Sequence, residues 1–114
     1  MITRLNPNQV FVFGSNMNGF HLGGAALQAR EWGAVWGIGF GRQGQTFAVP
    51  TLDTDMGKLP LTTIKYYLQE LVWHAKMHPN TEFLLTAIGQ GIAGFSKEEI
   101  ESVMPELPPN VIRV

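Results

Sequence analysis

Two glycine-rich segments hold most of the residues of this chain that could bind a ligand or act on one. The first is "FGSNMNGFHLGGAALQA", residues 13–29, and the second is "IGQGIAGF", residues 88–95. Of the 13 glycines in the chain, most lie between residues 14 and 44 or in the second segment. Glycine loses more backbone entropy on folding than other residues, so clustered glycines indicate a need for positive φ or for close approach to the backbone. The pattern favours backbone that binds a ligand over a flexible linker, because apolar residues are interleaved with the glycines.

Few side chains in these segments could do acid–base chemistry. Between Gly14 and Arg30 the chain has no Asp, Glu or Lys, and His21 is the only candidate base there. Imidazole has a reference pKa of about 6.5, so His21 could assist catalysis near neutral pH. Its ring could equally hydrogen-bond a loop carbonyl, and the sequence leaves both roles open. We interpret Asp53 and Asp55 as residues of a polar turn.

A metal site is not expected. His74 and His78 have the i, i+4 spacing that can hold a metal on a helix, but no third ligand is evident. We therefore interpret both histidines as the polar last turn of a helix, where they complement the helix dipole. The chain has no cysteine, which excludes disulfides, thiol catalysis and Cys-based zinc sites.

Alternating strands and helices must position these residues. Apolar runs predict strands at 10–13, 46–50, 82–88 and 110–114, and we expect Pro50 to end the second of them. Helices are predicted at about 23–32, at 61–77, where the apolar spacing is helical, and after Ser96, which forms a capping-box pattern with Glu99. Residues 33–45 form either a glycine-punctuated connection or an irregular hairpin. The order predicts an α/β fold with a mostly parallel sheet and helices on both faces.

Both glycine-rich segments follow a predicted strand and precede a predicted helix. Ligands of such folds bind outside the carboxyl ends of the strands, and the first N–H groups of a helix are unpaired donors. Two such loops side by side predict a site for two phosphates or a diphosphate, held by backbone alone. No lysine lies between Gly14 and Gly44, which excludes a Walker loop there. A nominal G-x-G-x-x-G at residues 39–44 follows no clear strand, so we do not interpret it as a dinucleotide fingerprint.

Length and composition indicate one globular domain, residues 1–114. Hydrophobic residues make up 45% and charged residues 15% of the chain, and the formal net charge is −1. A near-neutral chain has no basic field to gather duplex nucleic acid or an anionic membrane surface. No apolar run could span a bilayer and no signal peptide is evident, so we expect a cytoplasmic protein. The sequence does not specify an oligomeric state.

The motifs "VFVFGSN", "HLGGAALQA" and "FLLTAIGQGIAGFSKEEI" resemble the ligand loops of the macrodomain superfamily, in particular small macrodomain-like proteins of phages and bacteria. The resemblance implies a three-layer α/β/α fold with ADP-ribose, or a related nucleotide, in a cleft. It implies that Asn16 contacts the distal ribose, that Phe95 packs beside it, and that the glycines cradle the diphosphate. The implied ligand-binding residues are Gly14, Ser15, Asn16, Gly23, Gly24, Gly89, Gln90, Gly91, Ile92, Ala93, Gly94 and Phe95. The adenine-binding carboxylate of many macrodomains has no counterpart, since Asn6 and Asn8 precede the first strand.

Two activities remain open on this resemblance. If the protein hydrolyses an ADP-ribosyl bond, we expect Asn16 and His21 to position water at the distal ribose. Many hydrolytic macrodomains carry an acidic residue in the first glycine-rich loop, and its lack here disfavours their mechanism. The alternative is a non-enzymatic reader or sequestering protein for a nucleotide signal or for an ADP-ribosylated macromolecule. A third possibility is an α/β scaffold whose glycines serve only packing. We expect no cofactor in any of these cases.

Overall fold

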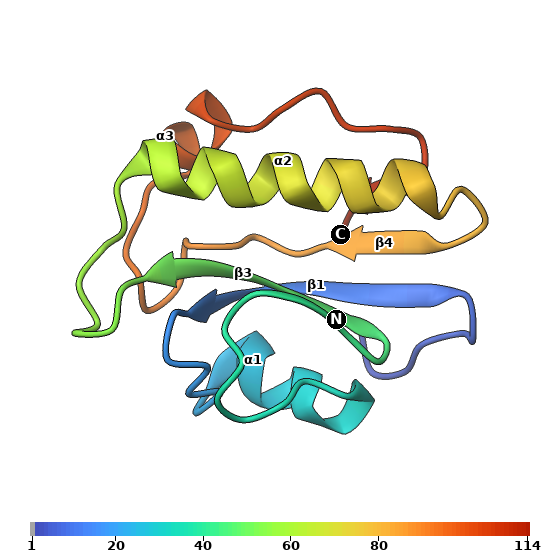
Figure 1. Cartoon of the computed structure of the whole chain (residues 1–114), viewed down its shortest axis with the longest axis horizontal. Coiled ribbons are helices and arrows are strands. Elements are labelled where there is room, and N and C mark those ends of the chain that lie inside the picture. The colour runs from blue at the N-terminus through green and yellow to red at the C-terminus, as the bar shows by residue number, and fades with distance from the viewer. Residues whose placement is uncertain (1) are drawn as a thin grey trace.

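A computed structural model describes residues 2–114 of the chain as an α/β fold with a five-stranded sheet in the order β2-β3-β1-β4-β5 (Figure 1). The strands are β1 (Gln9–Asn16), β2 (Gly41–Gln43), β3 (Thr46–Leu52), β4 (Glu82–Leu85) and β5 (Val111–Arg113). The α-helices are α1 (Gly24–Ala29), which continues into a 3-10 turn (Arg30–Trp32), α2 (Leu61–Met77) and α3 (Lys97–Ser102).

The sheet is mostly parallel, as the element order predicts. The central strand β1 pairs in parallel with β3 on one side and with β4 on the other, and β5 continues the sheet in parallel beyond β4. Only β2 runs antiparallel, as the first strand of a tight hairpin with β3. Residues 33–45 therefore contain a hairpin, which is one of the two structures that the sequence left open.

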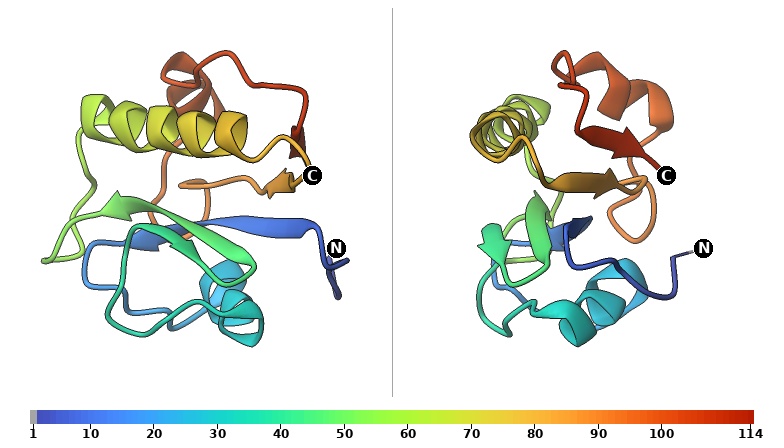
Figure 2. Two further views of the ribbon diagram at one scale, coloured as in Figure 1. Left: turned by 45° about the vertical axis from the view of Figure 1, so that its right-hand side comes forward. Right: turned by 90° about the vertical axis from the view of Figure 1, so that its right-hand side faces the viewer.

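Helices cover both faces of the sheet (Figures 1 and 2). Val10 and Val12 of β1 belong to the larger core cluster, together with the buried face of α2. Phe11 and Phe13 belong to a second cluster, together with Ala29 of α1. Successive side chains of a strand point to opposite faces, so a strand covered on both faces is apolar at every position. The run Val10 to Phe13 follows this rule.

Three strand ends differ from the prediction. β1 continues to Asn16, so the start of the first glycine-rich segment is part of the sheet. β3 runs through Pro50 to Leu52, and the prediction that Pro50 ends the strand is wrong. A proline is tolerated there because β2 pairs only with residues 46–48 of β3, and no ladder on that side needs an N–H from Pro50. β4 ends at Leu85, three residues before the predicted end.

The helices match their predicted positions. α2 spans the predicted residues, and Gly33, at φ 119°, stops the 3-10 turn that follows α1. Ser96 accepts a hydrogen bond from Glu99 N at 3.0 Å, and the Glu99 carboxylate accepts one from Ser96 N at 2.9 Å. The capping box is therefore confirmed. Within residues 2–114, no helix is long and apolar enough to cross a membrane.

Candidate ligand-binding site

A cavity of about 310 Å³ lies outside the carboxyl ends of β1, β3 and β4. Both glycine-rich segments line it, and the end of β3 with the turn that follows it lines a third side. The lining residues are Gly14, Ser15, Asn16, Phe20, Leu22, Gly23, Gly24, Ala25, Ala26, Thr51, Leu52, Met56, Thr86, Ala87, Ile88, Gly89, Gly91, Ile92 and Ala93. This is the edge of the sheet at which an α/β fold binds ligands.

The two glycine-rich segments touch at Gly14. A Cβ atom on Gly14 would lie 3.2 Å from the backbone nitrogen of Gly89 and 3.5 Å from the Cα atom of Ile88. Neither neighbour is the flexible end of a side chain, so a larger residue at Gly14 would push the segments apart. Glycine at this position therefore allows the end of β1 to approach the second segment closely.

Asn16 fixes the shape of the first segment. Its Oδ1 atom accepts a hydrogen bond from Phe20 N at 2.9 Å, and its Nδ2 atom donates one to Phe20 O at 2.9 Å. The neighbouring Ser15 donates its hydroxyl to the carbonyl of Gly39. Asn16 lines the cavity, but both polar atoms of its side chain already bind the backbone of the same loop. Its first effect is to position that loop.

The second segment folds back on itself. Phe95 N donates to Gly89 O at 2.9 Å, and Gly94 N donates to Gly91 O at 3.0 Å. Gly89 and Gly94 have φ values of 72° and 75°, a region that residues with a side chain rarely adopt. Gly91 has no such constraint, and a Cβ atom added there would meet no atom within 4 Å.

Unpaired backbone donors occur in both segments. In the part of the chain that the structure describes, the N–H groups of Gly89, Gly91, Ile92 and Ala93 donate to no backbone or side-chain acceptor. α1 begins at Gly24 without a side-chain cap, which leaves its first N–H groups without partners. Gly89 and Ala93 are buried residues, and buried N–H groups need acceptors, whereas Gly91, Ile92 and Gly24 are exposed and their N–H groups are open to water or to a ligand. The cavity therefore suits a ligand that is rich in oxygen atoms.

Among residues 2–114, no ionisable side chain lines the cavity. Its polar side chains are Ser15, Asn16, Thr51 and Thr86. Around them lie four large apolar side chains that are substantially exposed: Phe20 at 41%, Leu22 at 67%, Met56 at 44% and Ile92 at 85%. We call these four residues the apolar rim. The cavity thus combines neutral backbone donors with apolar contact surface, and it presents no general acid or base.

His21 lies outside the cavity lining and is fully buried. Its Nε2 atom is 3.0 Å from the carbonyl oxygen of Val35, and its ring packs edge-on against Phe13 with centroids 5.3 Å apart. The Nδ1 atom is buried and has no hydrogen-bond partner among the described residues. Of the two roles that the sequence left open, this geometry is that of the hydrogen bond to a loop carbonyl.

Three other residues expected at the ligand lie elsewhere. Phe95 is 6% exposed and belongs to the main core beneath the second segment, so it does not line the cavity. Gln90 lines a neighbouring cavity. Gly94 lines neither cavity, and its carbonyl accepts a hydrogen bond from Lys58 Nζ at 3.1 Å. A Gly-x-x-Gly-aromatic pattern does not reveal which of its residues turn inward, because that depends on the packing of α3 over the loop.

The turn at residues 53–58, which the sequence predicts only as a polar turn, connects the two glycine-rich segments. Asn18 donates its Nδ2 group to Thr54 O at 2.8 Å, which joins the turn to the first segment. Lys58 joins it to the second segment through Gly94 and also lies 5.0 Å from the ring centroid of Phe95. We call residues 53–58 the bracing turn. Its partners are 36 residues away in either direction, so no local pattern predicts these contacts.

The Asp53 carboxylate stabilises the bracing turn by accepting hydrogen bonds from the turn's own backbone. Its Oδ1 atom accepts hydrogen bonds from Asp55 N at 2.8 Å and from Gly57 N at 2.9 Å, which confirms its interpretation as a turn residue. Its backbone N–H donates to Gly57 O at 2.8 Å. Inside this closed turn, Met56 has a φ of 64°, the one positive φ of a residue other than glycine within residues 2–114.

A second cavity, of about 270 Å³, lies on the other side of residues 86–88. It is lined from α3 and β5 by Lys97, Glu101 and Arg113, among others. Arg113 forms a two-point ion pair with Glu101, with 3.0 Å between Nη2 and Oε2, and this contact lowers the pKa of Glu101. Glu101 and Arg113 therefore neutralise each other in the second cavity, and neither lines the first.

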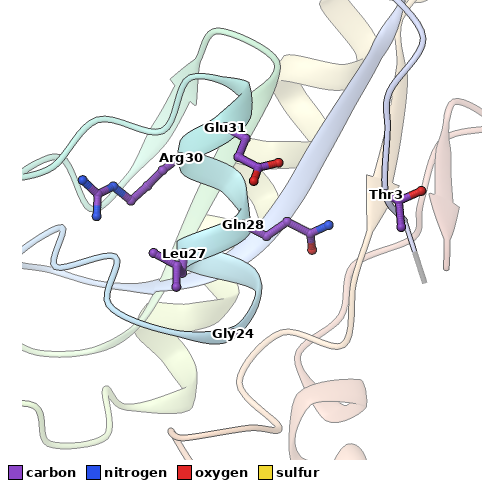
Figure 3. Close-up of a pocket in the computed structure, with 6 residues that line it drawn as sticks. All are labelled: Thr3, Gly24, Leu27, Gln28, Arg30 and Glu31. Atoms are coloured by element: carbon purple, nitrogen blue, oxygen red, sulfur yellow. The ribbon is translucent and has the colours of Figure 1, made fainter.

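A wide hollow on the outer side of α1 touches the first cavity at Gly24 (Figure 3). Thr3 of the N-terminal segment lines one side of it, and the other lining residues, Leu27, Gln28, Arg30 and Glu31, lie along α1 and the 3-10 turn that follows (Figure 3). Gln28 donates to the carbonyl of Ile2 and so ties the N-terminal segment to α1. The guanidinium of Arg30 lies 5.6 Å from the ring of Trp36. These contacts are those of a helix surface.

The side chains of His74 and His78 form hydrogen bonds within the protein. The Arg42 guanidinium lies 3.1 Å from His74 Nε2, so this nitrogen accepts a hydrogen bond, and His78 Nδ1 lies 2.8 Å from His74 O. Burial, followed by the charges of His78 and Arg42, lowers the pKa of His74 to about 4. Among residues 2–114, no group of three or more His, Cys, Asp or Glu side chains could hold a metal ion.

Comparison of the chain with protein-family models, with curated proteins and with solved structures finds no match.

Proposed function

We propose that the cavity binds ADP-ribose or a related nucleotide, with the phosphates on the backbone N–H groups of the two glycine-rich segments. The observation that carries this proposal is that both segments line one cavity with unpaired backbone donors. Backbone donors in glycine-rich loops bind phosphate without a basic side chain, which agrees with the near-neutral charge of the chain. A macrodomain-like three-layer fold is part of the same proposal, and the helices on both faces of the sheet support it.

Binding without catalysis fits the cavity better than hydrolysis. Cleavage of an ADP-ribosyl bond needs a group that activates water or attacks the anomeric carbon. No ionisable side chain lines the cavity, His21 is buried outside it, and Asn16 uses both polar atoms to hold Phe20. We therefore propose a reader or sequestering protein, whose ligand is a free nucleotide or an ADP-ribosyl group on a partner macromolecule.

The size of the cavity bears on which part of the ligand it holds. Ligand sites usually measure about 300–1,000 Å³, and this cavity of about 310 Å³ is at the small end. A group of mononucleotide size would fill it, and the rest of a dinucleotide would extend past the mouth. An open end of this kind suits a ligand that is attached to a macromolecule.

Titration calorimetry with ADP-ribose, AMP and NAD tests the proposal, with Gly91→Ala and Gly91→Val as graded variants. A Cβ atom at Gly91 would meet no atom within 4 Å, so we expect both variants to fold with a free energy of unfolding within about 0.5 kcal/mol of wild type. We expect saturable binding that weakens in Gly91→Ala and is lost in Gly91→Val. Flat titrations with all three compounds would refute the nucleotide proposal. Release of ADP-ribose from an ADP-ribosylated peptide would refute the non-enzymatic part of it.

A further inference from the structure

We propose that Met56 and Phe20 form a contact surface for the aromatic base of the ligand, and that this surface binds the face of the ring without reading its edge. This inference rests on the proposed function, because it assigns the second half of the same nucleotide. The glycine-rich segments would hold the phosphates, and the apolar rim would hold the base.

Met56 has an unusual backbone conformation in the bracing turn, with a φ of 64°. A positive φ in a residue other than glycine is strained, and such residues cluster at ligand sites. The two hydrogen bonds that Asp53 accepts and the bond from Met56 N to Asp53 O at 3.1 Å hold the turn in this shape. Within this constrained turn, the Met56 side chain lines the cavity and remains 44% exposed.

The bracing turn fixes Met56 relative to both glycine-rich segments. The hydrogen bonds from Asn18 to Thr54 and from Lys58 to Gly94 flank Met56 in the sequence, two residues on either side. A ligand that spans the segments and the turn would therefore meet a preorganised site. Preorganised contacts bind more tightly because less conformational entropy is lost on binding.

Phe20, a second member of the apolar rim, is also held in place. Its ring stacks on Trp36 with centroids 5.1 Å apart and an interplanar angle of 18°. Its backbone is fixed by the two hydrogen bonds to Asn16. A supported aromatic ring that lines a cavity and is 41% exposed offers stacking area to a planar group.

The chemistry of the rim favours an aromatic ring with little selection among bases. A thioether makes favourable contacts with aromatic rings, and stacking on phenylalanine is available to every base. Leu22 and Ile92 complete the rim, so none of its four side chains can donate a hydrogen bond, and the Met56 thioether is at most a weak acceptor. Discrimination between bases needs hydrogen bonds to their edges, so we expect adenine and guanine nucleotides to bind within a few-fold of one another.

Methyl NMR of protein labelled at its methionine methyl groups tests the contact. Three probes separate the halves of the site: adenosine carries a base without phosphate, inorganic pyrophosphate carries phosphate without a base, and ADP-ribose carries both. We expect adenosine and ADP-ribose to move the Met56 methyl signal upfield by the ring current, and pyrophosphate to leave it in place. Met17 and Met77, which are exposed and do not line the cavity, are internal controls.

Met56→Asn is the matching variant, because asparagine adopts positive φ more readily than methionine and removes the apolar contact. We expect it to weaken ADP-ribose binding about tenfold, which corresponds to the loss of one well-placed apolar contact, and to leave pyrophosphate binding unchanged. Met17→Asn, at an equally exposed methionine outside the cavity, should leave both affinities unchanged.

The outcomes separate this inference from the proposed function. ADP-ribose binding that is lost in Gly91→Val but does not move the Met56 methyl signal would overturn the base contact and leave the phosphate site standing. If adenosine shifts the Met56 methyl signal and Gly91→Val binds ADP-ribose as tightly as wild type, the base contact would be supported and the phosphate site overturned. Flat calorimetric titrations, combined with no response of Met56 to any probe, would overturn both.

Discussion

Acidification from pH 7.5 to pH 5 should destabilise the protein through His74. This half-buried imidazole on α2 accepts a hydrogen bond from Arg42 of β2 and stacks on His78 with centroids 4.2 Å apart. The rings of Phe47 and Phe83, from β3 and β4, lie 5.4 Å and 5.5 Å away. A proton on Nε2 would replace this hydrogen bond with repulsion between two cations, in surroundings that solvate the charge poorly.

The size of the effect follows from the lowered pKa. Burial is the main cause of a folded-state pKa of about 4, compared with 6.5 for a free imidazole. The unfolded chain then binds more protons than the folded one. The contribution of His74 to the free energy of unfolding is therefore fully present above pH 6.5 and is lost as the pH falls from 6.5 through 4. Linkage gives a loss of about 2 kcal/mol between pH 7.5 and pH 5. His74 is partly exposed, and solvent screening reduces this to about 1 kcal/mol.

Urea unfolding of wild type and His74→Gln at pH 7.5 and pH 5 measures this loss. Glutamine can still accept the hydrogen bond from Arg42 but does not titrate, so the variant should lose about 1 kcal/mol less than wild type. Measurements stop at pH 5 because the pKa values of Glu99 and Glu101 are lowered, and their contributions are lost only at more acidic pH. An NMR titration midpoint near 6.5 for His74, or equal pH dependence in both proteins, would refute the reasoning.

Three further substitutions test contacts around the site. Gly39→Ala places a Cβ atom 2.2 Å from the carbonyl oxygen of Asn16, so the backbone must shift and urea unfolding should show a loss of about 2 kcal/mol or more. Ser96→Ala removes the hydroxyl that accepts the hydrogen bond from Glu99 N, so urea unfolding should show a loss of about 1 kcal/mol, while the Ser96 N–H, the main cause of the lowered pKa of Glu99, stays in place. Asn18→Ala frees one end of the bracing turn, so amide hydrogen exchange within residues 54–57 should accelerate while overall stability falls by about 1 kcal/mol or less.

Each of these substitutions has an internal comparison. Gly23→Ala adds a Cβ atom in open space and should change stability by less than about 0.5 kcal/mol. Equal effects of Gly39→Ala and Gly23→Ala would contradict the close approach described for Gly39. An unchanged free energy of unfolding in Ser96→Ala would contradict the capping box. Uniform acceleration of exchange in Asn18→Ala, without a focus on residues 54–57, would contradict a local brace.

Local patterns predicted much of the fold. The helical spacing of apolar residues from Leu61 to Met77 was sufficient to predict α2, because one face of this helix packs on the sheet. The Ser96–Glu99 pattern was sufficient to predict the start of α3, because both hydrogen bonds of the capping box are local. The position of both glycine-rich segments after neighbouring parallel strands also followed from element order. The prediction that they lie side by side is confirmed by the contact between Gly14 and Gly89.

Other features depend on residues far apart in the sequence. β1 extends to Asn16 because β3 continues beside it as far as Leu52, a pairing between residues 36 apart. The role of His21 depends on the carbonyl of Val35, and that of Phe95 on its place in the core. Met56 lines the cavity because Asn18 and Lys58 hold its turn in place. The residues next to Asn18 and Lys58 in the sequence form no pattern that predicts these contacts.

The central position of β1 has a consequence for the order in which the molecule can fold. β1 is the first strand along the chain, yet its partners are Thr46–Leu52 on one side and Glu82–Leu85 on the other. A chain growing from the ribosome must therefore expose Val10 to Phe13 until the partner strands have been made. Parallel pairing over such sequence separations folds slowly because long loops must close first. A nascent chain that stops before β4 has one flank of its central strand uncovered, and we expect aggregation to begin there.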